Sequence, residues 1–175
     1  SYSLPAWECK TGSKLRQVKG SVCASCYALK GNYTRYKAIK AAQYDRLEKI
    51  KNSLWVAAMV VQVKRQKYFR WHDAGDVQDL EHLNKIYSVC KLTPEVKHWM
   101  PTREAWIKNY LYNKPGNLVI RFSPPMIGQR NDSWPNSSMV VESGATCPAP
   151  KQNNSCGDCR QCWDPAVKVV SYGKH

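Results

Sequence analysis

The sequence predicts a single α/β domain in which parallel strands form a partial or open (β/α) barrel. Its length of 175 residues suits one domain with its own hydrophobic core. Short β-rich runs alternate with helical segments, and such alternation is typical of parallel βαβ units. About five or six β-rich runs are present, fewer than a closed barrel needs. An open doubly wound sheet is the alternative.

The first part of the chain predicts an irregular start and then one or two helices. Residues 1–33 are rich in Gly, Ser and Lys, which favour loops. Between residues 34 and 66, apolar side chains recur near helical spacing. The residues on this expected apolar face are Tyr36, Ile39, Leu47, Ile50 and Leu54. Asn52 and Ser53 offer a break and a new cap, so two helices or one bent helix are expected.

A strand, a loop and a helix are predicted next. The aromatic run at residues 67–76 ends in Gly-Asp and predicts a short strand followed by a loop. Residues 79–90 predict a helix, for which Asp76 is a candidate N-cap. The apolar face of this helix comprises Leu80, Leu83, Ile86, Tyr87 and Cys90. Cys90, as a small hydrophobic residue on that face, is expected to be buried.

The same pattern then repeats towards the end of the chain. Thr102 can cap a helix over residues 103–112, which a Pro-Gly turn at residues 113–116 follows. The remaining strands are expected at residues 95–100, 117–123, 138–143 and 166–172. The last two of these strands lie on either side of a cysteine-rich segment.

Polar side chains follow several of the predicted strands. In α/β folds the chemistry lies at the carboxyl ends of the strands, in the loops that lead to the helices. The residues expected at this rim are His72, Asp73, Asp76, Thr102, Arg103 and Ser123. Helix capping also accounts for Asp76 and Thr102, and loop hydrogen bonding accounts for His72 and Asp73. No complete catalytic motif is present, so the sequence leaves open whether the protein is an enzyme.

The chain is strongly basic. Its 27 Lys and Arg residues outnumber 13 Asp and Glu residues, for a net charge of +14. Such a surface attracts nucleic acid, although a solvated basic surface without a polyanionic partner explains the same composition. There is no long apolar run, so a soluble protein with no membrane contact is expected.

The cysteines are the clearest chemical signal. Residues 147–163 hold four of the eight cysteines, including a C-x2-C-x2-C motif formed by Cys156, Cys159 and Cys162. Cys23 and Cys26 form a separate C-x2-C pair. Such close spacing brings several sulfur atoms into one small volume, as a metal centre requires. In a reducing cytoplasm, the spacing therefore favours metal binding over disulfides.

The segment at residues 147–163 predicts a [4Fe-4S] cluster. The C-x2-C-x2-C motif can surround one corner of a cubane cluster, and a more distant Cys next to Pro is the usual fourth ligand. Cys147, which Pro148 follows, can serve in this way although it lies upstream. Zinc is the alternative, because it also binds four thiolates, usually from two separate C-x2-C pairs.

The N-terminal cysteines leave the number of metal centres open. Cys9, Cys23 and Cys26 can hold a second cluster in which one iron has no protein ligand. Alternatively, Cys23 and Cys26 join the C-terminal cysteines in one shared site.

Several motifs resemble a known family. The runs SLPAWECK, SVCASCYALKGNY, FRWHDAGDVQDLEHL and CGDCRQCWDPAVKVVSYGKH are similar to the phage-encoded "gene product eighty-eight" family. The resemblance spans almost the whole chain and implies a viral protein that acts in the cytoplasm of a bacterial host.

A more distant similarity is to radical S-adenosylmethionine enzymes. Those enzymes combine N-terminal thiols, a Gly-Asp loop and a (β/α) barrel, and they bind their cluster through C-x3-C-x2-C. Here thirteen residues separate Cys9 from Cys23, so the match departs from that motif at its first gap.

Three functions from different classes remain. The preferred one is a viral iron–sulfur protein whose [4Fe-4S] cluster is structural or transfers electrons to a redox partner protein. The second is a zinc-stabilised basic protein that binds nucleic acid. The third is a shortened enzyme similar to the radical S-adenosylmethionine family.

Overall fold

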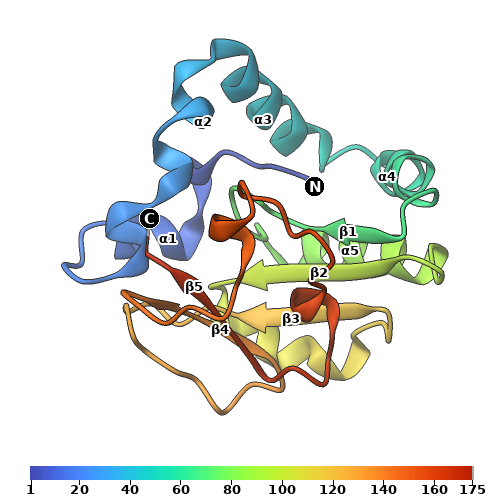
Figure 1. Cartoon of the computed structure of the whole chain (residues 1–175). Helices are drawn as coiled ribbons and strands as arrows, with labels where there is room; N and C mark the ends of the chain where they lie inside the picture. The colour runs from blue at the N-terminus through green and yellow to red at the C-terminus, as the bar shows by residue number, and fades with distance from the viewer. Residues whose placement is uncertain (175) are drawn as a thin grey trace.

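The structure, a computed structural model that describes residues 1–174, is a five-stranded parallel sheet that curls into a half-barrel (Figure 1). The strands are β1 (Tyr68–Arg70), β2 (Lys97–Thr102), β3 (Leu118–Phe122), β4 (Ser137–Val141) and β5 (Val169–Gly173). Their order in the sheet is their order in the chain, and every neighbouring pair is parallel. This arrangement confirms the predicted open barrel in one domain. A doubly wound sheet is wrong, because the strand order never reverses.

Helices cover the sheet and its carboxyl edge. The α-helices are α1 (Lys10–Leu15), α2 (Asn32–Arg35), α3 (Lys37–Lys49), α4 (Trp55–Val63) and α5 (Leu80–Leu92). The 3-10 helices are η1 (Ala6–Glu8), η2 (Val22–Ser25), η3 (Tyr27–Leu29), η4 (Ala105–Asn113), η5 (Ala149–Lys151) and η6 (Gln161–Trp163). In Figure 1, α5 lies behind the sheet, whereas the chain between β4 and β5 crosses its front. The expected irregular start is instead a series of short helices.

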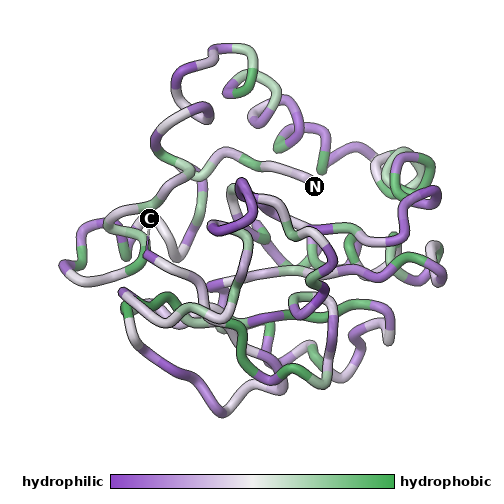
Figure 2. Tube along the Cα trace, in the orientation of Figure 1, coloured by the Kyte–Doolittle hydropathy of each residue, from purple (hydrophilic) through white to green (hydrophobic). Residues whose placement is uncertain are grey.

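The helical region at residues 34–66 divides as predicted, but much of its expected apolar face is exposed. α3 ends at Lys49 and α4 begins at Trp55, with the Asn52 side chain accepting a hydrogen bond from the Leu54 N–H at 2.8 Å. The exposed fractions of Tyr36, Ile39 and Leu54 are 51%, 37% and 70%. α3 lies outside the sheet, and hydrophilic residues recur along it in Figure 2. The expected face is correct at Ile50, which is buried in the core, and at Leu47, which packs against it. It is wrong at the other three residues, because the start of α3 and the turn before α4 lie away from the core.

The helix α5 follows its predicted pattern, except at its start. Leu83, Ile86, Tyr87 and Cys90 are buried, whereas Leu80 is exposed. The N-cap is Asp79, whose carboxylate accepts a hydrogen bond from the His82 N–H at 2.8 Å. Asp76 is not the N-cap, because its carboxylate is directed towards the end of β2 instead.

Thr102 does not begin an α-helix. It is the last residue of β2, and the helix that follows it is the 3-10 helix η4. Its hydroxyl group nevertheless accepts a hydrogen bond from the Glu104 N–H at 3.0 Å, as a capping side chain would. The predicted turn at residues 113–116 is present between η4 and β3.

The N-terminal residues extend the sheet beyond β1. The Tyr2 N–H donates to the Arg70 carbonyl at 3.3 Å, and the Tyr2 carbonyl accepts from the His72 N–H at 2.9 Å. The Leu4 N–H then donates to the Ala74 carbonyl at 2.9 Å. These bonds hold the start of the chain along the β1 edge and direct it towards the carboxyl ends of the strands.

A buried histidine gives the fold a pH-dependent stability. His98 of β2 is fully buried, and burial lowers its pKa to about 4. In the unfolded chain its pKa returns to about 6.5, so between these values the unfolded chain binds more protons and stability falls as the pH falls. From about pH 7 to about pH 5, His98 should account for a loss on the order of 2 kcal/mol.

Urea unfolding at both pH values measures this loss. The variant His98→Gln keeps a hydrogen-bonding group beside the Thr93 hydroxyl group, which lies 2.9 Å from His98 Nε2. We expect a smaller loss of stability in this variant than in the wild type. Equal losses would show that His98 does not carry the effect.

Candidate metal centres

The carboxyl ends of β1, β2 and β3 are joined by a network around Asp76. Its buried carboxylate accepts hydrogen bonds from the Thr102 hydroxyl group at 2.7 Å and the Arg103 N–H at 2.8 Å. Burial raises the pKa of Asp76 to about 6. The Arg103 guanidinium donates to the carbonyls of Ser123 and Pro124. The structure therefore brings Asp76, Thr102, Arg103 and Ser123 together at the predicted rim.

His72 and Asp73 lie beside this network but have separate contacts. His72 is buried with a φ of 53°, its ring lies 5.4 Å from the His82 ring, and burial lowers its pKa well below the usual value. The Asp73 carboxylate accepts hydrogen bonds from the hydroxyl groups of Ser3 and Tyr33. Although burial opposes it, these bonds lower the pKa of Asp73. Both residues thus serve packing and loop structure.

The N-terminal thiols converge at the same rim. Cys9 and Cys26 pack around Ala6, Ala28 and Ala74, and burial raises the pKa values of Cys9 and Cys23. The positive charge of Arg103, which opposes this rise at Cys23, lies close to that thiol.

Gly12 packs closely against two of these thiols. A Cβ atom at Gly12 would lie 3.6 Å from Cys23 Sγ, 3.7 Å from Cys9 Sγ and only 2.9 Å from the Cys9 Cβ. Any larger residue would therefore displace Cys9.

Glu104 holds α1 and its thiol against the rim. Its buried carboxylate accepts hydrogen bonds from the N–H and hydroxyl groups of Thr11, each at 3.0 Å. The Trp106 indole N–H donates to the same carboxylate at 3.0 Å. Since Thr11 lies next to the Cys9 and Gly12 turn, Glu104 fixes this turn relative to β2.

The four C-terminal cysteines line one small pocket. Its wall comprises Cys147, Pro148, Ala149, Cys156, Cys159, Gln161, Cys162, Trp163 and Val170. Cys162 is buried, and its sulfur lies 3.1 Å from the Tyr172 hydroxyl oxygen. Burial raises the pKa of Cys162 to about 11. The Cys147 N–H donates to the Ser171 carbonyl of β5 at 3.0 Å, which ties the start of the segment to the sheet.

A buried arginine ties the end of the same segment to the sheet. Arg121 of β3 is fully buried, and its guanidinium group donates only to backbone carbonyls. Nε donates to Cys162 at 3.1 Å, and the other two nitrogens donate to Ser137, Gln161, Asp164 and Val167 at 2.7 to 3.3 Å. Arg121 therefore fixes the turn η6, which carries Cys162.

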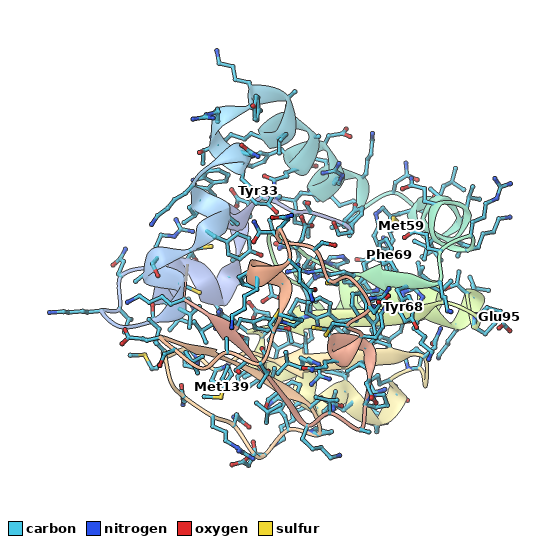
Figure 3. The ribbon with its side chains drawn as sticks, viewed as in Figure 1. Tyr33, Met59, Tyr68, Phe69, Glu95 and Met139 are labelled. Carbon is cyan, nitrogen blue, oxygen red and sulfur yellow. The ribbon has the colours of Figure 1, made fainter. Side chains whose placement is uncertain are left out.

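Aromatic side chains close one side of this pocket. The Trp163 ring meets the rings of Trp99 at 5.2 Å and Tyr68 at 5.6 Å, and its N–H donates to the Phe69 carbonyl at 3.0 Å. The Arg160 guanidinium lies 4.8 Å from the centre of the Tyr68 ring. Figure 3 labels Tyr68 and Phe69 on β1, next to this segment. The aromatic contacts shield the thiols from water on the side of the sheet.

The seven candidate cysteines thus form two groups. The pocket of the C-terminal group includes none of the N-terminal thiols, and a site shared by the two groups stays a prediction. Cys90 belongs to neither group and is buried among core residues, as predicted. Among residues 1–174, no three His, Cys, Asp or Glu side chains are close enough to enclose a single metal ion. No helix in the described chain is long and apolar enough to cross a membrane.

Sequence reasoning missed three residues that position the thiols. These residues are Gly12, Glu104 and Arg121. Arg121 alone left a signal, because a charged residue interrupts an otherwise apolar run at residues 118–122. The roles of Gly12 and Glu104 depend on contacts between distant parts of the chain, which no local pattern records.

Residues 1–133 match the family described as Gene product 88. The chain belongs to the Gene product 88 family. No curated protein and no solved structure matches the chain. The part that matches Gene product 88 contains the strands β1 to β3 and the N-terminal thiols, whereas the C-terminal thiols follow it. Membership confirms the resemblance to this phage family, but the comparisons do not show a similarity to radical S-adenosylmethionine enzymes.

Proposed function

We propose that this protein binds a [4Fe-4S] cluster through Cys147, Cys156, Cys159 and Cys162. The observation that supports the proposal is the single pocket on which all four thiols meet. In such a cluster each thiolate binds a different iron, so the ligands surround a larger volume than the ligands of one ion do. Four thiolate donors with apolar surroundings match the ligands of this group. The pocket has a volume of about 10 Å³, so the thiols would have to move apart to admit the cluster.

Within this proposal, the surrounding residues control the charge and the access of water at the cluster. The cluster would supply one-electron chemistry or rigidity. Arg121 lies beneath Cys162 and carries a positive charge, which favours the more negative reduced state and so raises the potential. Trp163 shields the thiols on the sheet side, whereas Cys156 is exposed and marks the side that a redox partner protein in the host cytoplasm would approach.

A second candidate centre is favoured by the N-terminal thiols. Cys9, Cys23 and Cys26 meet at the carboxyl ends of the strands, where α/β proteins perform their chemistry. Gly12 packs directly against Cys9 and Cys23, so these two thiols lie close to one turn of α1. Three thiolates would leave one iron of a cluster without a protein ligand. The third function, a shortened enzyme similar to the radical S-adenosylmethionine family, depends on this centre.

Iron and acid-labile sulfide analysis of protein purified without oxygen tests both centres. The wild type should contain about four irons and four sulfides per chain for one cluster, or about eight of each for two. Cys159→Ser should remove the C-terminal cluster, and Cys23→Ser should remove only the N-terminal one. Cys90→Ser is the matched control and should retain all the iron, because Cys90 is buried away from both groups.

Two results would overturn the main proposal. Full iron retention in Cys159→Ser would show that the C-terminal thiols bind no cluster. About one zinc per chain and no sulfide would support the zinc-stabilised protein instead.

A further inference from the structure

The N-terminal part of the chain concentrates positive charge. Between Glu8 and Asp45 there is no acidic residue, although eight Lys and Arg residues occur in this stretch. The chain forms α1, α2 and most of α3 here, together with the short helices between them. Figure 1 shows these elements at the carboxyl edge of the sheet and above it, away from η4. The charge is therefore local to one region of the fold.

A basic surface formed by α2, the first turn of α3 and the residue Lys30 before α2 contains four of these charges. We define it by Lys30, Arg35, Lys37 and Lys40, all of which are exposed. Within residues 1–174, none of the four forms an ion pair with an acidic side chain. By contrast, Lys49 in the last turn of α3 pairs with Asp45 at 2.6 Å. The four charges of the basic surface are thus available to an anionic partner.

Aromatic side chains lie among these charges. Tyr36 lies between Arg35 and Lys37 at the junction of α2 and α3, and 51% of its surface is exposed. The Lys40 ammonium group lies 4.6 Å from the centre of the Trp7 ring. Exposed aromatic rings between basic residues are typical of surfaces that bind single-stranded nucleic acid, because bases stack on the rings while cations contact the phosphates.

A groove lies next to the basic surface. It has a volume of about 510 Å³ and lies between α3 and the N-terminal residues, with Tyr33, Ile39 and Asp73 in its wall. The wall also contains the cation Arg46. The Asp73 carboxylate remains ionised, because the Ser3 and Tyr33 hydroxyl groups donate to it. The backbone of a bound strand is therefore expected to avoid the Asp73 end of the groove and to follow Arg46 and the basic surface.

We propose that this basic surface binds single-stranded nucleic acid, with Lys30, Arg35, Lys37 and Lys40 on the phosphates and Tyr36 beneath a base. The binding is independent of the metal centres, and it adds a partner that the iron–sulfur proposal does not require. A variant that lacks the C-terminal cluster, such as Cys159→Ser, should therefore still bind, provided that it remains folded.

Fluorescence anisotropy with a labelled single-stranded DNA of about twenty nucleotides tests the charges. The variant Arg35→Glu/Lys37→Glu/Lys40→Glu should weaken binding on the order of a hundredfold at about 0.1 M salt, and it should reduce the salt dependence of the affinity. The matched control is Lys64→Glu/Lys91→Glu/Lys108→Glu, which makes the same change in net charge at exposed residues on α4, α5 and η4. The control should lose only a fewfold in affinity.

A second pair of variants tests stacking. Tyr36→Ala should weaken binding about tenfold without changing the salt dependence, because stacking involves no phosphate. Tyr112→Ala is its control, since Tyr112 is 79% exposed but lies on η4. Circular dichroism and iron content should match the wild type in each of the charge-reversal and tyrosine variants.

Two outcomes would overturn the proposal. Equal losses in the two charge-reversal variants would show that only net charge attracts the strand. Binding of a duplex as tightly as the single strand, with no effect of Tyr36→Ala, would exclude the stacking surface.

Discussion

Arg121→Met should lower the free energy of unfolding by on the order of 4 kcal/mol or more. The arginine is fully buried, and its five hydrogen bonds all reach backbone carbonyls, four of them in η6 and the turn after it. Methionine fills much of the same volume but donates no hydrogen bond, so all five bonds would be lost in the protein interior. The carbonyls of Gln161, Asp164 and Val167 would each keep one other donor. Urea unfolding measures the loss.

Arg130→Met is the matched control for this prediction. Arg130 forms a surface ion pair with Asp132 at 2.6 Å, and 61% of its side chain is exposed, so its loss should change stability by less than about 1 kcal/mol. Arg121→Met should also reduce iron content, because the turn that carries Cys162 would no longer be fixed. If Arg121→Met fails to fold, Arg121→Lys, which retains three donors, should show a smaller loss in both measurements. Similar, small losses at positions 121 and 130 would contradict this role for Arg121.

Gly75→Ala should destabilise the protein by on the order of 3 kcal/mol. Gly75 has a φ of 81°, a conformation that alanine adopts at a cost. A Cβ atom there would also lie 2.5 Å from the Leu4 Cβ and 2.9 Å from the Leu4 carbonyl oxygen. The N-terminal residues would have to move away from β1, and Cys9 would move with them.

Gly128→Ala separates these two causes. Gly128 has a similar φ of 77°, but nothing lies within 4 Å of the Cβ position, so only the backbone cost applies. Gly128→Ala should therefore lower the free energy of unfolding by about 1 kcal/mol. Thermal or urea unfolding of both variants provides the comparison, and equal losses would show that contact with Leu4 contributes nothing.

The strands of the sheet were predictable because each one is a short, continuous run of mainly apolar residues in the sequence. Val119 and Ile120, for example, lie in a short β-rich run that a turn precedes, and they became part of β3. The role of Asp76 was not predictable, because both a cap and a contact with the end of β2 suit an Asp before a helix. Only the position of Thr102 in space decides between them. The apolar face predicted for α3 was partly wrong for a related reason. The spacing of apolar residues does not show whether a core lies beside the helix.

The candidate site was predictable where its cysteines are close in sequence. The spacing of Cys156, Cys159 and Cys162 indicated one group, and the structure places them with Cys147 on one pocket. Cys9 is separated from Cys23 by thirteen residues, so its place depended on how α1 folds back. That turn is held by Glu104, which lies more than ninety residues away along the chain. Local patterns carry no information about such a contact.

The hydrogen bonds of Arg121 also set an order of events during synthesis. Four of its carbonyl partners follow it by 40 to 46 positions, so β3 leaves the ribosome well before they do. Until those residues arrive, the guanidinium group must remain hydrated, because an unpaired charge is costly to bury. The turn η6 therefore docks late in the folding of the nascent chain. During that interval Cys156, Cys159 and Cys162 lie on an undocked segment, so the cluster that we propose for them would bind before the segment closes over the sheet.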